Sequence, residues 1–402
     1  MGIGGIGAST KRRVEIHPYR SQSPPLLHQP PPPPPQFSPA VYRAILLAAA
    51  VGLMYVVLGQ SDSPPPQLPI SPPSSPREDS TQTNLSPERE SEASLFHMFK
   101  SEDLTSQKWE KDGNELELIL RKASIEDRKT VIITTVNAAW MEPSSLFDLF
   151  LESFKIGNET QKFLENLVVV AMDQEAYHRC KMVHRHCFAL TTEGVDFSGE
   201  AKFRSGDYLE MMWRRIDFLR SVLEMGYSFI FSDVDIAWMR DPFPRLYEEG
   251  DIQMACDVFV FNSTSRWNFP NAGFVYAKSN PRSIQFYKYW VAKREAGKHD
   301  QDVFYKIKHD PFMEEIGLDL RFLDTAYFSG LCEPSRDLDE VVTMHANCCT
   351  KLKSKIHDIR MVIEDWKNYK MGGPNKWSVP RICGVRKADL EKMKALARAA
   401  HA

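Results

Sequence analysis

Three short apolar segments most constrain the fold of this 402-residue chain. Their sequences are TVIITTV (Thr130–Val136), LVVVAM (Leu167–Met172) and YSFIF (Tyr227–Phe231), and amphipathic segments separate them. Continuous apolar residues, rather than apolar residues alternating with polar ones, are typical of strands that are covered on both faces. The pattern therefore predicts an α/β domain with a mainly parallel, Rossmann-like sheet flanked by helices.

The segments around these runs complete the predicted alternation of strands and helices. Apolar residues recur with helical spacing over Pro143–Ile156 and Asp207–Met225, and Gly226 is suited to end the second of these helices. Further helices are expected over residues 281–295 and 301–307, and further strands over residues 251–256, 273–277 and 321–323.

Two functional classes are disfavoured by the sequence. No Gly-x-Gly-x-x-Gly follows the first apolar run, which argues against an enzyme that uses a nicotinamide or flavin dinucleotide. Lys and Arg together number 50 against 53 Asp and Glu, and no nucleic-acid-binding motif is present. Nucleic acid is therefore not an expected partner.

Two carboxylates, Asp233 and Asp235, follow the third apolar run in the sequence YSFIFSDVDIAWMRDPF. Side chains two residues apart in an extended chain point to the same side, so both carboxylates can bind one divalent cation and its diphosphate. Ligands of α/β sheets also bind beyond the carboxyl ends of strands. The segment therefore predicts a metal–diphosphate site, and the alternative is a solvated acidic turn.

Further ligands of the metal and the nucleotide can be proposed from position. His345, in TMHANCC, is a candidate third metal ligand because two carboxylates leave coordination positions of Mn²⁺ or Mg²⁺ open; the alternative is a structural histidine. Thr135 and Asn137 end the first apolar run and are expected near the nucleotide. Arg215 precedes the metal segment on a predicted helix and is a candidate phosphate ligand, although most helix arginines are solvated.

Two later motifs carry polar groups that suit a sugar. In NAGFVYAKSN, Asn271 can bond a sugar hydroxyl and Gly273 lets the backbone approach a ligand, although a simple turn would also explain them. In HDQDVF, Asp300, Gln301 and Asp302 precede apolar positions, as at a helix start. Capping by Asp300 is compatible with sugar binding, and we take these three residues as the candidates for catalysis on the sugar side.

The N-terminal hundred residues differ from the rest in composition. No charged residue occurs from Ala44 to Ser61, basic residues precede this run and acidic residues follow it. This pattern predicts a single-pass membrane anchor whose C-terminal side faces the lumen, and a cleaved signal peptide is the alternative. The expected organisation is a proline-rich cytosolic tail (1–40), the anchor (41–60), a disordered stem (61–104), a catalytic domain (105–390) and a C-terminal tail (391–402).

Seven cysteines, all located after residue 179, suit an oxidising lumenal compartment. Cys180 and Cys187 are spaced to close a small loop. The odd number leaves at least one cysteine unpaired within the chain. Crosslinks in the C-terminal part can form among Cys332, Cys348, Cys349 and Cys383, in pairs that the sequence does not assign.

Several motifs together resemble the plant nucleotide-diphospho-sugar transferases of glycosyltransferase family 77, which include extensin arabinosyltransferases and pectin xylosyltransferases. They are FSDVDIAWMRDPF, NAGFVYAKSN, HDQDVFYKI, LDTAYFSGLCEPSRD and TMHANCCTKLKSKIHDIR. The resemblance spans most of residues 105–385. It implies a GT-A fold, a type II Golgi membrane anchor, a manganese-type ion at Asp233 and Asp235, and transfer with retention of anomeric configuration.

These observations predict a metal-dependent glycosyltransferase that uses a nucleotide sugar, with UDP as the expected nucleotide. The expected acceptor is a cell-wall polysaccharide or glycoprotein. A sugar nucleotidyltransferase and a catalytically silent membrane protein are the alternatives, and the first of these lacks its glycine-rich phosphate loop here. The donor sugar, the linkage, the oligomeric state and the choice between a covalent and a front-face retaining mechanism stay open.

Overall fold

The computed structural model describes residues 113–125, 128–190, 192, 195–200 and 204–401. The predicted tail, anchor and stem, residues 1–104, lie outside these residues. Within the described part of the chain, no helix is both long enough and apolar enough to cross a bilayer.

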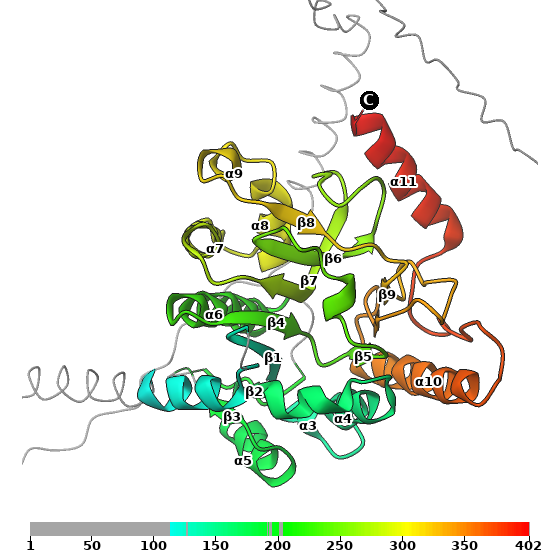
Figure 1. The fold of residues 1–402 in the computed structure, drawn as a ribbon, viewed down its shortest axis with the longest axis horizontal. Helices are drawn as coiled ribbons and strands as arrows, with labels where there is room; N and C mark the ends of the chain where they lie inside the picture. Colours follow the sequence, from blue (N-terminus) through cyan, green and yellow to red (C-terminus); the bar gives the residue numbers. More distant parts are fainter. Residues whose placement is uncertain (1–112, 126–127, 191, 193–194, 201–203, 402) are drawn as a thin grey trace, which may run out of the picture. The chain divides into compact units, whose positions relative to one another are not determined.

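A mixed, mostly parallel sheet forms the centre of the described region (Figure 1). All its neighbouring pairs are parallel except those of β7, which runs antiparallel to β4 and to β6. The predicted α/β class is therefore confirmed. The spatial order of the strands is β3 (Cys187–Ala189), β2 (Leu167–Ala171), β1 (Thr130–Val136), β4 (Ser228–Ser232), β7 (Phe269–Ala277), β6 (Ile252–Val258) and β8 (Leu320–Phe322).

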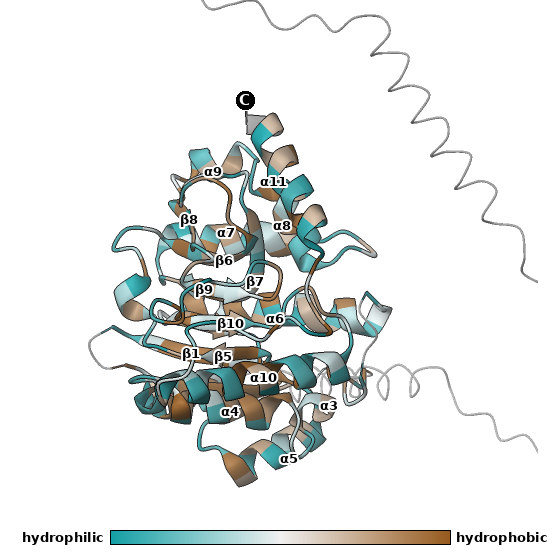
Figure 2. Ribbon diagram, turned by 90° about the vertical axis from the view of Figure 1, so that its right-hand side faces the viewer, coloured by the Kyte–Doolittle hydropathy of each residue, from teal (hydrophilic) through white to brown (hydrophobic). Residues whose placement is uncertain are grey.

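Helices cover both faces of this sheet, which explains why its central strands are continuously apolar. All seven residues of β1 are buried, and alternate side chains enter different core clusters. Val131 and Ile133 pack with residues of α6 (Gly206–Glu224), α7 (Pro281–Ala292) and α8 (Asp300–Ile307), whereas Ile132 packs with residues of α4 (Leu146–Ile156) and α10 (Leu352–Lys370). Figure 2 shows brown apolar and teal polar residues side by side on α4 and α10, as expected for helices with one buried face.

A smaller sheet packs into the core cluster that contains Ile132 and residues of α4 and α10. It connects the segment of Asp233 and Asp235 to the C-terminal region. Its strands are β5 (Ile236–Trp238), β10 (Thr343–His345) and β9 (Phe328–Gly330), in that order. His345 is paired with Ile236 in the β5–β10 register. Because Ile236 directly follows Asp235, this short ladder brings His345 beside the acidic pair.

Several shorter or later elements complete the described region. Residues 113–123 form a helix before β1. The helix α11 continues across residue 390, where the sequence placed the end of the catalytic domain. The remaining elements are α3 (Ala138–Met141), η1 (Gln161–Asn166), α5 (Gln174–Val183), η2 (Phe243–Arg245), α9 (Phe312–Glu315) and α11 (Lys387–His401).

Three disulfides connect the cysteines that the sequence marked as candidates. The first, Cys180–Cys187, joins α5 to β3 as expected. The other two resolve the pairing that spacing left open, and they link the segment after β10 to two other parts of the C-terminal region. They are Cys332–Cys348 and Cys349–Cys383, and Cys256 remains as a buried free thiol.

Removal of these crosslinks should destabilise the fold in the order of the loops that they close. The Cys349–Cys383 loop spans 34 positions and the Cys180–Cys187 loop spans 7. Chain entropy predicts a loss of about 4 kcal/mol for the double serine variant of the long loop and about 2.5 kcal/mol for that of the short loop. Urea unfolding of the two variants measures both losses, and a larger loss for the short loop would contradict this assignment.

Candidate functional site

The two predicted metal-binding carboxylates lie in the turn between β4 and β5. The N–H of Asp233 donates to the carbonyl oxygen of Gly273 at 2.7 Å, which fixes the end of β4 against β7. The N–H of Ile236 donates to the carbonyl oxygen of Asp233 at 3.2 Å and closes the turn. The N–H of Ala346 then donates to the carbonyl oxygen of Asp235 at 3.0 Å. Backbone hydrogen bonds from three elements therefore hold the acidic turn in place.

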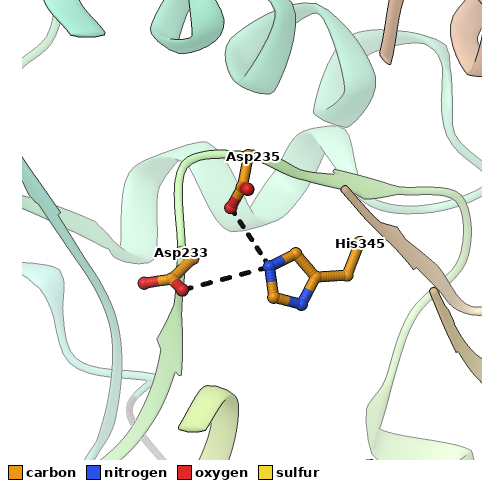
Figure 3. Close-up of side chains that lie close together, drawn as sticks. All are labelled: Asp233, Asp235 and His345. Atoms are coloured by element: carbon orange, nitrogen blue, oxygen red, sulfur yellow. Dashed lines mark ion pairs between the residues drawn. The ribbon is translucent and has the colours of Figure 1, made fainter. Parts of the chain in front are cut away.

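His345 points its imidazole between the two carboxylates (Figure 3). Its Nε2 lies 3.2 Å from Oδ1 of Asp235 and 4.0 Å from Oδ2 of Asp233. One ligand atom from each residue lies within 4.8 Å of the other two. The structure therefore brings together the three residues that the sequence proposed as metal ligands, and we call Asp233, Asp235 and His345 the metal group.

The charges around Asp235 are compensated even though the residue is buried. Burial disfavours its anionic form, but Lys355 and His345 outweigh this effect and hold the pKa of the carboxyl well below its usual range. Lys355, on α10, donates from Nζ to Oδ2 of Asp235 at 2.5 Å. Burial would lower the pKa of His345, yet Asp235 and Asp233 raise it overall. The arrangement therefore keeps an ionised carboxylate in a water-poor site.

The donor set suits a divalent cation. The possible ligands are carboxylate oxygens of Asp233 and Asp235 and an imidazole nitrogen of His345. This combination suits Mn²⁺ well. Mg²⁺ could use the same carboxylates, with a water molecule taking the place of the imidazole. Asp235 also faces positive charge from the protein itself, because Lys355 and His345 both contact its carboxylate. The residues therefore fit a metal ion.

Arg215 connects the acidic turn to the predicted sugar-binding helix. The side chain, 4% exposed, donates from one terminal nitrogen to Oδ1 of Asp233 at 3.0 Å and from the other to Oδ2 of Asp300 at 2.7 Å. Asp300 is fully buried, and Nδ1 of His299 lies 2.9 Å from its second oxygen. Arg215 also lines the pocket beside the acidic turn, so it orients two carboxylates, and its predicted contact with a phosphate stays a prediction.

The other predicted sugar-binding residues surround a pocket of ≈ 340 Å³ beside the metal group. Asn271, Gly273, Gln301 and Asp302 line it, whereas Asp300 lies behind it. Gln301 accepts a hydrogen bond from the N–H of Ala272 at 3.3 Å, so the start of α8 is fixed to β7. Because β7 runs antiparallel to β4, its first residues lie at the same sheet edge as the carboxyl end of β4.

Of the polar residues of this pocket that the sequence reasoning missed, four come from separate segments of the chain. Asp257, at the end of β6, accepts from Nδ2 of Asn271 at 2.8 Å and from Nδ2 of Asn347 at 2.9 Å, and burial raises its pKa. The hydroxyl of Tyr208 lies 3.1 Å from Nε2 of His299. Asp257 is hidden in an apolar strand, and Lys355 in a helix rich in basic residues. These four missed residues are Asp257, Asn347, Tyr208 and Lys355.

Thr135 and Asn137 are not among the described residues that line this pocket. Both are buried. Asn137 caps α3 by accepting from the N–H of Trp140 at 3.2 Å, and its Nδ2 donates to the carbonyl oxygens of Phe197 and Gly199 at 2.9 Å. Its polar atoms are thus engaged in structural bonds, and its nucleotide role stays a prediction.

Comparisons with known proteins identify relatives of this chain. The sequence profile of a family described as "Nucleotide-diphospho-sugar transferase" matches residues 162–359, which include the acidic turn and His345. An uncharacterized Arabidopsis thaliana protein is 51% identical over 263 residues, covering 65% of this chain and 69% of that protein. The UDP-D-xylose:L-fucose alpha-1,3-D-xylosyltransferase 3 of A. thaliana is 23% identical, covering 46% of this chain and 52% of that protein. The solved structure of mouse xyloside xylosyltransferase 1 is 14% identical and aligns with a TM-score of 0.34, covering 55% of this chain and 99% of that one.

The substitution Gly273→Ala should disturb the metal group without changing any of its ligands. A Cβ at this position would lie 2.6 Å from Cε1 of His345 and 2.8 Å from Oδ2 of Asp233. Displacement of either group should weaken Mn²⁺ binding about tenfold or more, as measured by titration of the full-length protein. The control is Gly206→Ala, because a Cβ there meets no atom within 4 Å. Equal Mn²⁺ affinities of both variants would contradict this description of the site.

The substitution Arg215→Met should lower the free energy of unfolding by about 3–5 kcal/mol, because it removes the guanidinium from the buried carboxylate of Asp300 and leaves only His299 as an ion-pair partner among the described residues. The matched control is Arg214→Met on the same helix. Arg214 is more exposed and lies 3.9 Å from Asp217, so its loss should cost less than about 1 kcal/mol. Chemical unfolding of both variants measures the difference, and similar losses would show that the buried pair is not special.

Proposed function

Since the chain belongs to the nucleotide-diphospho-sugar transferase family and is a glycosyltransferase, we propose that it transfers a sugar from a UDP-sugar to a cell-wall glycan or glycoprotein in the Golgi. The observation that carries the proposal is the group of Asp233, Asp235 and His345 beside the pocket at the edge of the sheet. A GT-A fold is the corresponding architecture, and a mixed, mostly parallel sheet supports it.

The diphosphate is proposed to lie against the metal group. A divalent ion held by Asp233, Asp235 and His345, with Mn²⁺ preferred, would neutralise the negative charge of the leaving nucleoside diphosphate. Lys355 lies at the same group and lines the pocket, so it can also contact a phosphate oxygen. Arg215 holds the carboxylate of Asp233 in orientation and contributes a positive charge beneath the site.

The sugar is proposed to occupy the part of the pocket lined by α8 and β7. The bond between its anomeric carbon and the diphosphate oxygen breaks and the nucleoside diphosphate leaves with the electron pair. A bond to the acceptor oxygen forms, and the proton of the acceptor hydroxyl passes to the departing diphosphate or to water. Asn271, Gln301 and Asp257 present amide and carboxylate groups that can bond sugar hydroxyls. Asp302 also lines the pocket, whereas Asp300 is fully buried behind Arg215. Of the acidic residues predicted for the sugar side, Asp302 is therefore the one placed to contact the sugar.

The donor, acceptor and location rest on different grounds. A plant relative is named as a transferase that uses UDP-D-xylose, which supports a UDP-linked donor. The Golgi location rests on the uncharged segment 44–61 and the basic residues before it, and lumenal exposure agrees with three disulfides in the described region. Retention of anomeric configuration is proposed from the family resemblance.

Manganese-dependent hydrolysis of UDP-sugars by the full-length, detergent-solubilised protein tests the proposed function. We expect release of UDP from at least one of a panel of UDP-sugars, abolished by chelation of the metal. Asp235→Asn should reduce the rate about a hundredfold or more, because it removes a metal ligand. The control is Asp241→Asn in the same segment, where the side chain pairs with Lys162 instead. The absence of both hydrolysis and nucleotide binding with every donor of the panel would contradict the proposal.

A further inference from the structure

A second and larger pocket lies beside the catalytic pocket, between the segment after β8 and the helix α11. Its volume is ≈ 850 Å³, against ≈ 340 Å³ for the pocket at the metal group. We call it the α11 groove and define it by Phe259, Tyr327, Glu333, Arg336, Trp377 and Lys394. No residue of the proposed donor site lines this groove in the described part of the chain.

The α11 groove and the catalytic pocket share a wall. Asp257 lines the catalytic pocket and Phe259 lines the groove, so at most about 7 Å of chain separates them. The N–H of Phe259 donates to Oε2 of Glu333 at 3.0 Å. Glu333 follows Cys332, whose disulfide partner Cys348 lines the catalytic pocket. A ligand that extends from the catalytic pocket over this wall would therefore enter the groove within a short distance.

The lining of the groove combines aromatic rings with polar groups. Phe259, Tyr327 and Trp377 supply three aromatic side chains, and each is neither fully buried nor fully exposed. The indole N–H of Trp377 is itself buried and has no acceptor among the described residues, so the ring rather than this N–H is what the groove offers to a ligand. Glu333 is held by the hydroxyl of Thr325 at 2.8 Å and by an ion pair with Lys394. Apolar faces with fixed hydrogen-bonding groups match sugars, whose rings have C–H faces and hydroxyl edges.

Part of this groove is built outside the region that matches the family. The match ends at residue 359, whereas Trp377 and all of α11 follow it. The catalytic pocket, by contrast, is formed by described residues from 204 to 355. Trp377 and α11 thus belong to a part of the groove that lies beyond the matched region, whereas Phe259, Tyr327 and Glu333 lie within it.

We propose that the α11 groove binds the acceptor, and that the acceptor is an oligosaccharide with several sugars beyond the one that receives the new linkage. This inference rests on the proposed glycosyltransferase function and specifies its substrate class. The acceptor sugar that receives the new linkage would lie beside Asp257 in the catalytic pocket. The next sugars of the acceptor would pass over Glu333, which separates the two pockets, and stack on Trp377.

Binding of labelled oligosaccharides to the full-length protein tests this proposal. The probes are neutral and uronate-containing plant cell-wall oligosaccharides of one to six sugars, presented without any nucleotide sugar. We expect at least one series in which affinity rises with length, and Trp377→Ala should weaken binding of its longest member about tenfold. The control is Trp267→Ala, which also removes a partly exposed tryptophan but one outside the groove. It should leave this binding unchanged.

Two further variants separate a binding defect from a folding defect. Trp377 packs against the core cluster that contains residues of α4 and α10, so Trp377→Phe keeps most of this packing while it replaces the indole by a smaller ring. Arg336→Ala changes an exposed residue of the groove. We expect both variants to unfold at the wild-type temperature and to bind the longest probe several-fold more weakly.

The test also distinguishes this proposal from the proposed function. Chelation of divalent metal ions should abolish hydrolysis of UDP-sugars but leave oligosaccharide binding unchanged, because the groove does not include the proposed metal ligands. Hydrolysis of a UDP-sugar without any length-dependent oligosaccharide binding would overturn the groove assignment and leave the transferase function in place. Wild-type binding by all the groove variants would also overturn it.

Discussion

A buried group of opposite charges is the feature on which the rest of the site depends. Asp233 and Asp235 lie close together where water is scarce, an arrangement that is unfavourable unless positive charges compensate it. Arg215 from α6, His345 from β10 and Lys355 from α10 supply this compensation. Each arises from a different part of the chain, so the site exists only when the large sheet, the small sheet and the helices are assembled.

The small sheet and the disulfides hold His345, one of the compensating positive groups, beside the acidic pair. The register of β5 and β10 places His345 opposite Ile236, next to Asp235. Directly after His345, the chain is crosslinked through Cys348 and Cys349 to two other segments. The histidine therefore has little freedom to leave the carboxylates. The proposed binding of a cation and its diphosphate would therefore use side chains that are already held close together, as transfer from a nucleotide sugar requires.

The sequence predicts those parts of the structure that a local pattern encodes. The run Thr130–Val136 has the bounds of β1, and the acidic pair sits at the end of β4 as expected. β5 and β10 have three residues each, too few to show a period, so the contact of His345 with Asp235 could be expected only from chemistry. Asp257 and Lys355 carry no local signal, because their roles come from contacts between segments about a hundred residues apart. The bonds from Nδ2 of Asn137 to Phe197 and Gly199 likewise join segments that are far apart in the sequence.

Anomalous diffraction at the manganese edge, from crystals of the protein grown with Mn²⁺ and UDP, tests the central claim most directly. The account predicts one strong peak bounded by carboxylate oxygens of Asp233 and Asp235 and by Nε2 of His345, with the diphosphate of UDP on its open side. Nucleotide bound with its diphosphate far from this group, or manganese bound elsewhere while Lys355 stays paired with Asp235, would contradict it.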